Sequence, residues 1–124
     1  MTTAIEVSRL RYAYDAQDGG ETHIVFDGLD LSVRQGSFVA ILGHNGCGKS
    51  TLAKHFNAIL LPESGKVYVD GADIWSKQNR KQIRRVRFQV GLCFQYPEYQ
   101  IFEEDVYKEI AFGPKQMGLD SEEI

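Results

Sequence analysis

Apolar and polar residues alternate in two stretches near the start of the chain, as they do in strands with one buried face. The first stretch is IEVSRLRY at residues 5–12, and the second contains Leu29, Leu31 and Val33 before an RQG turn. DAQDGGET at 15–22 lies between them, and its Gly and Asp residues are typical of a turn. The pattern predicts two half-buried strands that pair in antiparallel fashion.

A different pattern follows in SFVAIL at residues 37–42, which is continuously apolar. Such a run predicts a strand buried on both faces. The next segment, KSTLAKHFNAIL at 49–60, predicts a helix that ends near Pro62, because its large apolar residues recur at helical spacing. These residues are Leu52, Phe56, Ile59 and Leu60.

Four further elements are expected in the second half of the chain. KVYVDGADI at 66–74 predicts a hairpin around an Asp-Gly turn, and SKQNRKQIRRVR at 76–87 predicts a short basic helix. FQVGLCF at 88–94 predicts a second buried strand, and EEDVYKEIAF at 103–112 predicts a helix.

The composition is that of one globular domain, with 124 residues, 43% hydrophobic residues and a net charge of −3. Apolar runs are far shorter than the roughly 20 residues of a membrane helix, and the first residues lack a signal-peptide pattern, so we expect a cytosolic chain.

Cys47 and Cys93 lie outside any metal-ligand spacing, so we expect no disulfide and no zinc site. Asp120 and Glu123 have capping-box spacing so close to the end that a longer domain is expected.

The strongest chemical signal is GHNGCGKST at residues 43–51, which matches the phosphate-binding loop G-x-x-x-x-G-K-S/T between a predicted strand and a predicted helix. Gly43, Gly46 and Gly48 allow a tight turn in which successive N–H groups face a phosphate. The positive end of the helix that begins near Gly48 adds to this anion site. The alternative is a Gly-rich turn that only links a strand to a helix.

The polar residues of the loop have distinct expected roles. Lys49 is expected to reach the β- and γ-phosphates, Ser50 to place its hydroxyl on Mg²⁺, and Thr51 to bind the α-phosphate. His44, Asn45 and Cys47 occupy the variable positions and are expected to line the nucleotide. Among these, His44 is interpreted as solvent-facing rather than as a catalytic base, and Cys47 as a small filler.

With these motifs the chain resembles the N-terminal part of an ABC-type ATPase over nearly its whole length. The resemblance implies that Tyr14 in LRYAY stacks on adenine, and that Gln95, after the second buried strand, is the Q-loop glutamine that contacts Mg²⁺ or the attacking water. It implies an α/β fold class, a P-loop NTPase (ABC ATPase) core with an antiparallel β-subdomain that stops at the start of the helical subdomain. Residues 1–95 would form the β-subdomain and P-loop core, and residues 96–124 the Q-loop and the start of the helical region.

Within that superfamily, FQYPEYQIFEEDVYKEIAFGP at 94–114 closely resembles the energy-coupling-factor (ECF) ATPases. Those ATPases pair as homo- or heterodimers on the cytoplasmic face of the cell membrane, and with ATP and Mg²⁺ they power uptake of vitamins or of cobalt and nickel ions. The resemblance implies contact with a membrane coupling subunit through Tyr96–Phe102, and through it with a substrate-capture membrane protein. Such complexes often contain two related ATPase subunits. Tyr96 favours one of the two types, but it does not assign the subunit type.

The family's signature motif, its acidic strand with the catalytic glutamate and its switch histidine would lie beyond Ile124. Asp70 precedes a glycine in the predicted hairpin turn, and Glu103, Glu104 and Asp105 are the N-terminal residues of a predicted helix, so no catalytic residue is named. The chain alone is expected to bind MgATP without hydrolysing it. Two alternatives are a soluble phosphate-loop kinase, with RRVR as an arginine-rich lid, and a non-catalytic interaction module.

The basic run in the second half of the chain and His55 give two further predictions. A basic run without acids would suit a solvated helix face or contact with anionic lipid, and it comprises Lys77, Arg80, Lys81, Arg84, Arg85 and Arg87. Nucleic-acid binding is not expected, because the chain is acidic overall and offers no aromatic stacking surface beside that run. His55 is expected on the polar face of its helix.

Overall fold

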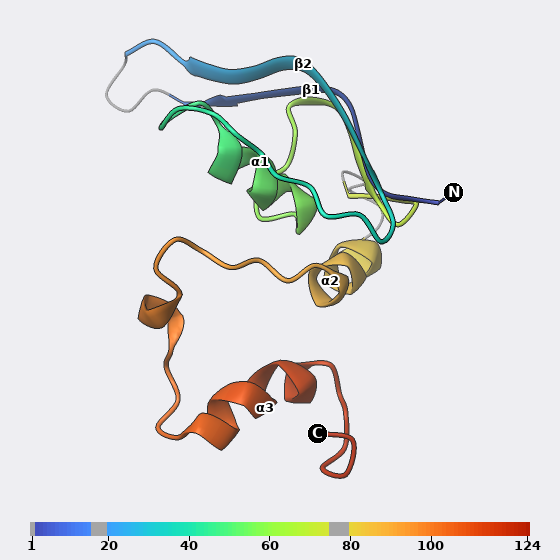
Figure 1. The fold of residues 1–124 in the computed structure, drawn as a ribbon, viewed down its shortest axis with the longest axis vertical. Coiled ribbons are helices and arrows are strands. Elements are labelled where there is room, and N and C mark those ends of the chain that lie inside the picture. Colours follow the sequence, from blue (N-terminus) through green and yellow to red (C-terminus); the bar gives the residue numbers. More distant parts are fainter. Residues whose placement is uncertain (1, 16–19, 75–79) are drawn as a thin grey trace. The chain divides into compact units, whose positions relative to one another are not determined.

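The computed structural model describes residues 2–15, 20–74 and 80–124, in two units that span Met1–Leu92 and Cys93–Ile124. An antiparallel sheet of four strands, in the order β2-β1-β3-β4, organises the first unit. Figure 1 shows two of its strands, β1 and β2, side by side. Its strands are β1 (Thr3–Tyr14), β2 (His23–Arg34), β3 (Ser64–Val69) and β4 (Ala72–Asp73).

Two helices, α1 (Lys49–Phe56) and α2 (Arg80–Gln89), complete the first unit. The second unit contains a short 3₁₀ helix, η2 (Pro97–Gln100), and α3 (Val106–Gln116). Among the described residues, none of these helices has the length and apolar character needed to cross a membrane.

The predicted antiparallel pair of strands is confirmed as β1 and β2, with Val7 opposite Leu31. An irregularity in β1 shifts the register between Val7 and Leu10, where Arg9 has a φ of 48°. The Arg9 N–H donates to Asp30 Oδ1 at 2.8 Å. Because of this bulge, Val7 and Leu10 are both buried although they are three residues apart.

The predicted Asp-Gly hairpin is also confirmed. Val69 of β3 pairs with Ala72 of β4, so Asp70 and Gly71 form a two-residue connection. Their φ angles of 49° and 81° are both positive, as a type I′ turn requires.

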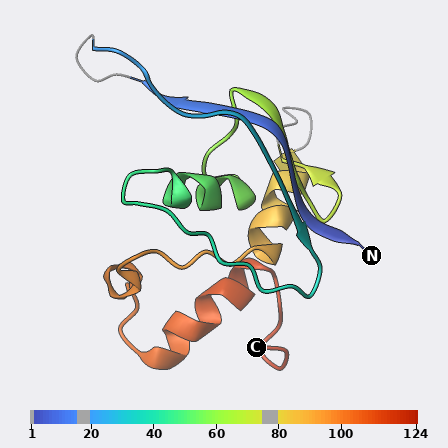
Figure 2. The same ribbon diagram turned by 45° about the horizontal axis from the view of Figure 1, so that its top comes forward.

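The core lies on one face of the sheet, where α1 and α2 cover it (Figure 2). Apolar side chains from β1, β3 and both helices meet there, and their burial is the main force that holds the helices on the sheet. The buried members are Val7, Leu10, Leu52, Ala58, Val67, Val69, Ile74 and Val86.

Helix α1 ends four residues earlier than its apolar spacing predicts. Ala58 takes a left-handed φ of 63°, which stops the helix, and Ile59 is exposed rather than part of the apolar face. The Arg87 guanidinium of α2 donates to the carbonyl of Asn57 at 3.4 Å and of Ala58 at 3.1 Å. A cation from α2 therefore satisfies carbonyls at the end of α1.

Both predictions of buried core strands are wrong in this structure. Residues 37–42 form no strand, and Phe38 and Leu42 are 98% and 91% exposed. Residues 88–94 divide between the end of α2 and a segment without regular structure. A strand is stable only when neighbouring strands form hydrogen bonds with its N–H and C=O groups. The described sheet consists of β1 to β4, and none of them pairs with 37–42 or 88–94, so a high content of apolar residues was not enough to form a strand there.

The basic helix predicted at 76–87 is confirmed as α2 from Arg80 onward, whereas 76–79 lie outside the described residues, as do 16–19 of the predicted turn. Within the described part of the basic run, Arg85 is exposed and Arg84 lies over the Phe88 ring, 5.6 Å from its centre. Lys77 of the same run also lies outside the described residues.

In the second unit, the predicted helix is confirmed as α3, shifted toward the C-terminus. Asp105 lies just before the helix, not within its first turn as expected, and caps it, since its Oδ1 accepts the Lys108 N–H at 2.8 Å. The capping box is present too: the Glu123 N–H donates to Asp120 and the Asp120 N–H to Glu123, at 2.9 and 3.2 Å. The hydrogen bond from the Ile124 N–H to the Asp120 carbonyl closes a single turn.

Replacing Gly65 with alanine should destabilise the first unit far more than replacing Gly71. Both glycines have a φ near 80°, which costs an L side chain about 1 kcal/mol. A Cβ atom at Gly65 would lie 2.1 Å from the Arg9 carbonyl oxygen, whereas at Gly71 it would meet open space. We expect Gly65→Ala to lose roughly 1–3 kcal/mol more than Gly71→Ala in urea denaturation. Equal losses would contradict this packing of β3 on the β1 bulge.

Candidate nucleotide site

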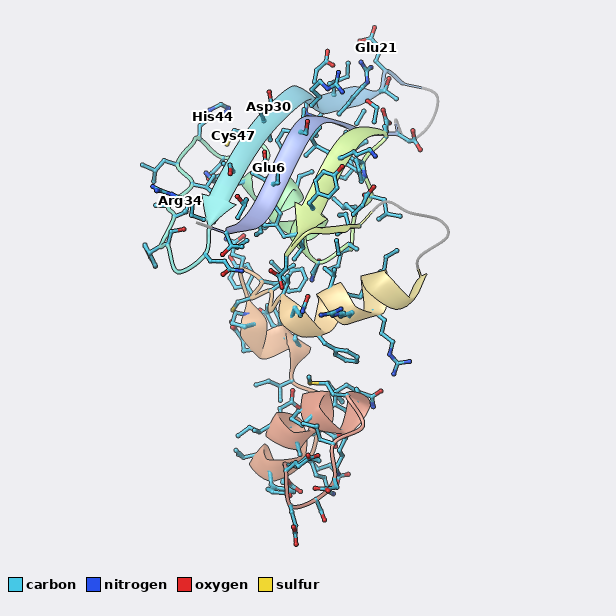
Figure 3. The ribbon with its side chains drawn as sticks, turned by 90° about the vertical axis from the view of Figure 1, so that its right-hand side faces the viewer. Glu6, Glu21, Asp30, Arg34, His44 and Cys47 are labelled. Carbon is cyan, nitrogen blue, oxygen red and sulfur yellow. The ribbon has the colours of Figure 1, made fainter. Side chains whose placement is uncertain are left out.

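The phosphate loop lies against β2, directly before α1. Gly48 begins the helix with a φ of 109°, and its carbonyl accepts the Leu52 N–H at 2.8 Å. A Cβ atom at Gly48 would lie 2.7 Å from Val25 and 2.9 Å from Phe26, so only glycine fits there. Figure 3 shows the loop residues His44 and Cys47 beside β2.

The start of α1 suits an anion. Its first turn contains no acidic residue, and the first N–H groups of any helix have no acceptor within the helix. Gly46, with a φ of 84°, turns the loop before the helix begins. Gly43, His44, Asn45 and Gly46 are exposed, so a ligand has access to the loop backbone. The loop therefore fits a phosphate group, which accepts hydrogen bonds and carries negative charge.

Lys49 folds back over the loop. Its Nζ donates to the carbonyl oxygens of Gly43 and His44, the second at 3.3 Å. The ammonium group is thus held beside the loop backbone by two neutral acceptors, and phosphate oxygens, which carry negative charge, would give stronger hydrogen bonds in their place.

The two hydroxyl residues that follow Lys49 have different environments. Ser50 is exposed, whereas Thr51 is buried and its Oγ1 lies 2.9 Å from the Tyr14 hydroxyl. Tyr14 ends β1, and 39% of it remains exposed. The structure therefore brings Tyr14 beside the phosphate loop, although 37 positions separate it from Thr51.

Magnesium would have few protein ligands here. Among the described residues there is no group of three or more His, Cys, Asp or Glu that could hold a metal ion. Mg²⁺ commonly keeps several waters and takes phosphate oxygens, so one exposed hydroxyl such as that of Ser50 fits it. Gln95, the other expected metal ligand, is exposed and belongs to the second unit, and its role stays a prediction.

His55 contradicts its expected place on the polar face, because it is fully buried. Its Nδ1 donates to the Thr51 carbonyl at 2.8 Å, while Nε2 has no hydrogen-bond partner. The ring packs edge-on against Tyr12 and Phe26, with centroids 4.9 and 6.3 Å away. Burial lowers the pKa of His55, and the carbonyl contact opposes this shift only in part.

Sequence reasoning missed the aromatic surroundings of the loop. Tyr12 and Tyr14 are two residues apart on β1, and their rings meet edge-on at 5.1 Å. Thr51 and His55 are four residues apart on α1, which places them on one helix face. These two spacings are visible in the sequence, but nothing in it indicates that the two faces meet. Burial raises the pKa of Tyr12, with the nearby charges of Tyr14, Asp15 and Glu63 adding to the effect.

The comparison with protein families decides the class of nucleotide-binding protein. The model of the ABC transporter family matches residues 26–122. The chain belongs to the ABC transporter family. This membership agrees with the predicted fold class and argues against the soluble-kinase alternative.

Sequence relatives indicate which members of the ABC transporter family the chain is similar to. The chain is 43% identical over 121 residues to the energy-coupling factor transporter ATP-binding protein EcfA2 of Clostridium tetani, which covers 98% of this chain and 41% of the relative. It is 47% identical over 116 residues to EcfA1 of Symbiobacterium thermophilum, at 91% and 39% coverage. The predicted resemblance to ECF ATPases is confirmed, and because both subunit types match, the type stays unassigned.

A solved structure supports the same fold. CbiO1 from Clostridium perfringens, described as part of the ABC transporter complex CbiONQ, matches with a TM-score of 0.76 and 36% identity. The match covers 98% of this chain and 45% of that one. The chain thus spans about two fifths of the length of the curated relatives that it matches.

Replacing His55 with leucine should remove a pH dependence of stability. Since the pKa of His55 is lowered on folding, the unfolded chain binds more protons, and wild-type stability should fall as pH drops below about 6.5. Urea denaturation at pH 7.5 and 5.5 measures this. We expect the wild type to lose more stability than His55→Leu between these values, by at most about 1.4 kcal/mol. An identical loss in both proteins would show that His55 does not take up a proton on unfolding.

Proposed function

We propose that this chain is the nucleotide-binding part of an ECF-type ABC transporter ATPase and that it binds MgATP. The observation that carries the proposal is the Tyr14–Thr51 contact, because it places an exposed aromatic ring beside a phosphate-binding loop. A base and a phosphate chain need these two features close together. The names of the relatives point to the same ligand.

In this proposal each loop residue acts on the part of the nucleotide that its geometry suits. Tyr14 stacks on the base, and backbone N–H groups from Gly43 to Gly48 surround the β-phosphate. Lys49 exchanges its two carbonyl acceptors for phosphate oxygens. Ser50 contributes to Mg²⁺ binding and Thr51 to α-phosphate binding. When bound, Mg²⁺ neutralises phosphate charge.

The activity of the whole protein belongs to the same proposal. Hydrolysis of ATP would drive uptake of a vitamin or a transition-metal ion, with a second ATPase subunit and a membrane coupling subunit as partners and the chain at the cytoplasmic side of the membrane. No residue of these 124 is assigned as the catalytic base. Gln95 would report the state of the nucleotide to the partner.

The second unit offers a surface for the coupling subunit. Tyr96, Tyr99, Ile101 and Phe102 are between 57% and 81% exposed, which is more apolar surface than a solvent-facing loop usually presents. The centroids of the Tyr96 and Tyr99 rings are 5.8 Å apart and those of Phe102 and Phe112 4.7 Å apart, so these rings lie together as an aromatic surface.

Lys49→Ala tests nucleotide binding, with Lys54→Ala in the last turn of the same helix as control. Lys49→Ala removes the ammonium group that lies beside the phosphate loop, whereas Lys54→Ala leaves it in place. We expect MgATP affinity, measured by isothermal titration calorimetry, to fall about 10- to 100-fold in Lys49→Ala and to stay within about twofold in Lys54→Ala. A wild-type chain that does not bind MgATP would overturn the proposal.

Tyr99→Ala tests the partner surface, with Tyr107→Ala as control, because Tyr107 is exposed in the same unit but lies outside Tyr96–Phe102. Loss of a central aromatic anchor should weaken retention by a purified coupling subunit about tenfold or more. The control should retain near wild-type binding, and MgATP affinity should be unchanged in both variants. Equal retention of Tyr99→Ala and wild type would place the interface elsewhere.

A further inference from the structure

The Tyr14 hydroxyl has no task in base stacking, which uses only the ring. In the structure it is paired with the hydroxyl of Thr51, with the two oxygens 2.9 Å apart. The two groups come from different elements, the end of β1 and the third residue of α1. A partly buried hydrogen bond thus joins the residue expected to hold the base to the residue expected to hold a phosphate.

Neighbouring contacts restrict the movement of this pair. Tyr14 packs edge-on against Tyr12, Tyr12 packs edge-on against His55, and His55 Nδ1 donates to the Thr51 carbonyl. Together with the Tyr14–Thr51 hydrogen bond, these contacts form a closed ring of four residues between β1 and α1. Thr51 is only 8% exposed, so its side chain has little freedom to leave this arrangement.

The chemistry of two hydroxyls and a phosphate allows one arrangement of protons. A hydroxyl donates one hydrogen bond and accepts others, whereas a phosphate oxygen only accepts. If Thr51 donates to Tyr14, its proton is not available to a phosphate. If Tyr14 donates to Thr51, the Thr51 proton is free, and the chain from Tyr14 through Thr51 to phosphate polarises each bond in the same direction.

We propose that Tyr14 is a positioning residue for the phosphate end of the site as well as a stacking residue for the base. Its hydroxyl donates to Thr51 Oγ1 and directs the Thr51 proton toward a phosphate oxygen. The inference rests on the proposed function, since it requires that the loop bind a nucleotide. It adds a hydroxyl-dependent role that phenylalanine at position 14 would not fulfil.

Magnesium tripolyphosphate separates the two roles of Tyr14, because it carries phosphates and no base. Tyr14→Phe keeps the ring and removes the hydroxyl. We expect the variant to bind MgATP and magnesium tripolyphosphate about 3- to 10-fold more weakly than wild type, by a similar factor for both ligands. Tyr14→Ala should lose the same factor for tripolyphosphate and a further factor for MgATP, since it also lacks the ring.

A double-mutant cycle tests whether the effect passes through Thr51. In a Thr51→Val background, which lacks the hydroxyl, Tyr14→Phe should change affinity by less than about twofold. In a Thr51→Ser background, which keeps it, the loss of about 3- to 10-fold should return. Thermal unfolding of each variant checks that it is folded, and Thr51→Ala, which also lacks the hydroxyl, replaces Thr51→Val if that variant does not fold.

Unchanged tripolyphosphate affinity in Tyr14→Phe would overturn the inference, and so would an equal loss with and without the Thr51 hydroxyl. Either result leaves the proposed function intact, because wild type still binds MgATP. A wild-type chain that binds neither ligand would overturn the proposed function and this inference with it.

Discussion

Close packing of Gly48 against β2 is the constraint on which the site depends. Val25 and Phe26 leave no room for a side chain at this position, and its φ of 109° starts α1 where the loop ends. The helix then buries Leu52 and His55 against the sheet. The phosphate loop is therefore held at its C-terminal end, by the contact of Gly48 with β2 and by the helix that packs in the core, and its exposed part from Gly43 to Gly46 is left to a ligand.

The polar contacts around the loop follow from that packing. Once α1 lies on the sheet, Thr51 meets the end of β1 and forms its hydrogen bond with Tyr14, and His55 is enclosed by Tyr12 and Phe26. An unpaired, buried imidazole nitrogen costs stability, and its neutral form is favoured by burial. The helix that presents the phosphate-binding residues thus also contains a buried polar atom without a hydrogen-bond partner, in a ring that packs against Tyr12.

Local patterns predicted much of the fold. The alternation in β1 and β2, the Asp-Gly turn and the capping box of Asp120 and Glu123 each depend on neighbours in sequence, and each is present. Apolar runs alone did not predict strands correctly. Residues 37–42 and 88–94 have the composition of buried strands, but neither segment forms a strand in this structure. A strand depends on partners elsewhere in the chain, and no local pattern reports whether they are available.

For the site, the sequence alone determined the loop, its lysine and its two hydroxyl residues, because glycine spacing and side-chain type are local properties. Family resemblance added Tyr14. Only the tertiary structure decided that Tyr14 meets Thr51 and that His55 is buried, since both depend on how α1 lies against β1. That placement results from the burial of apolar side chains over the whole unit, a non-directional force that no short segment encodes.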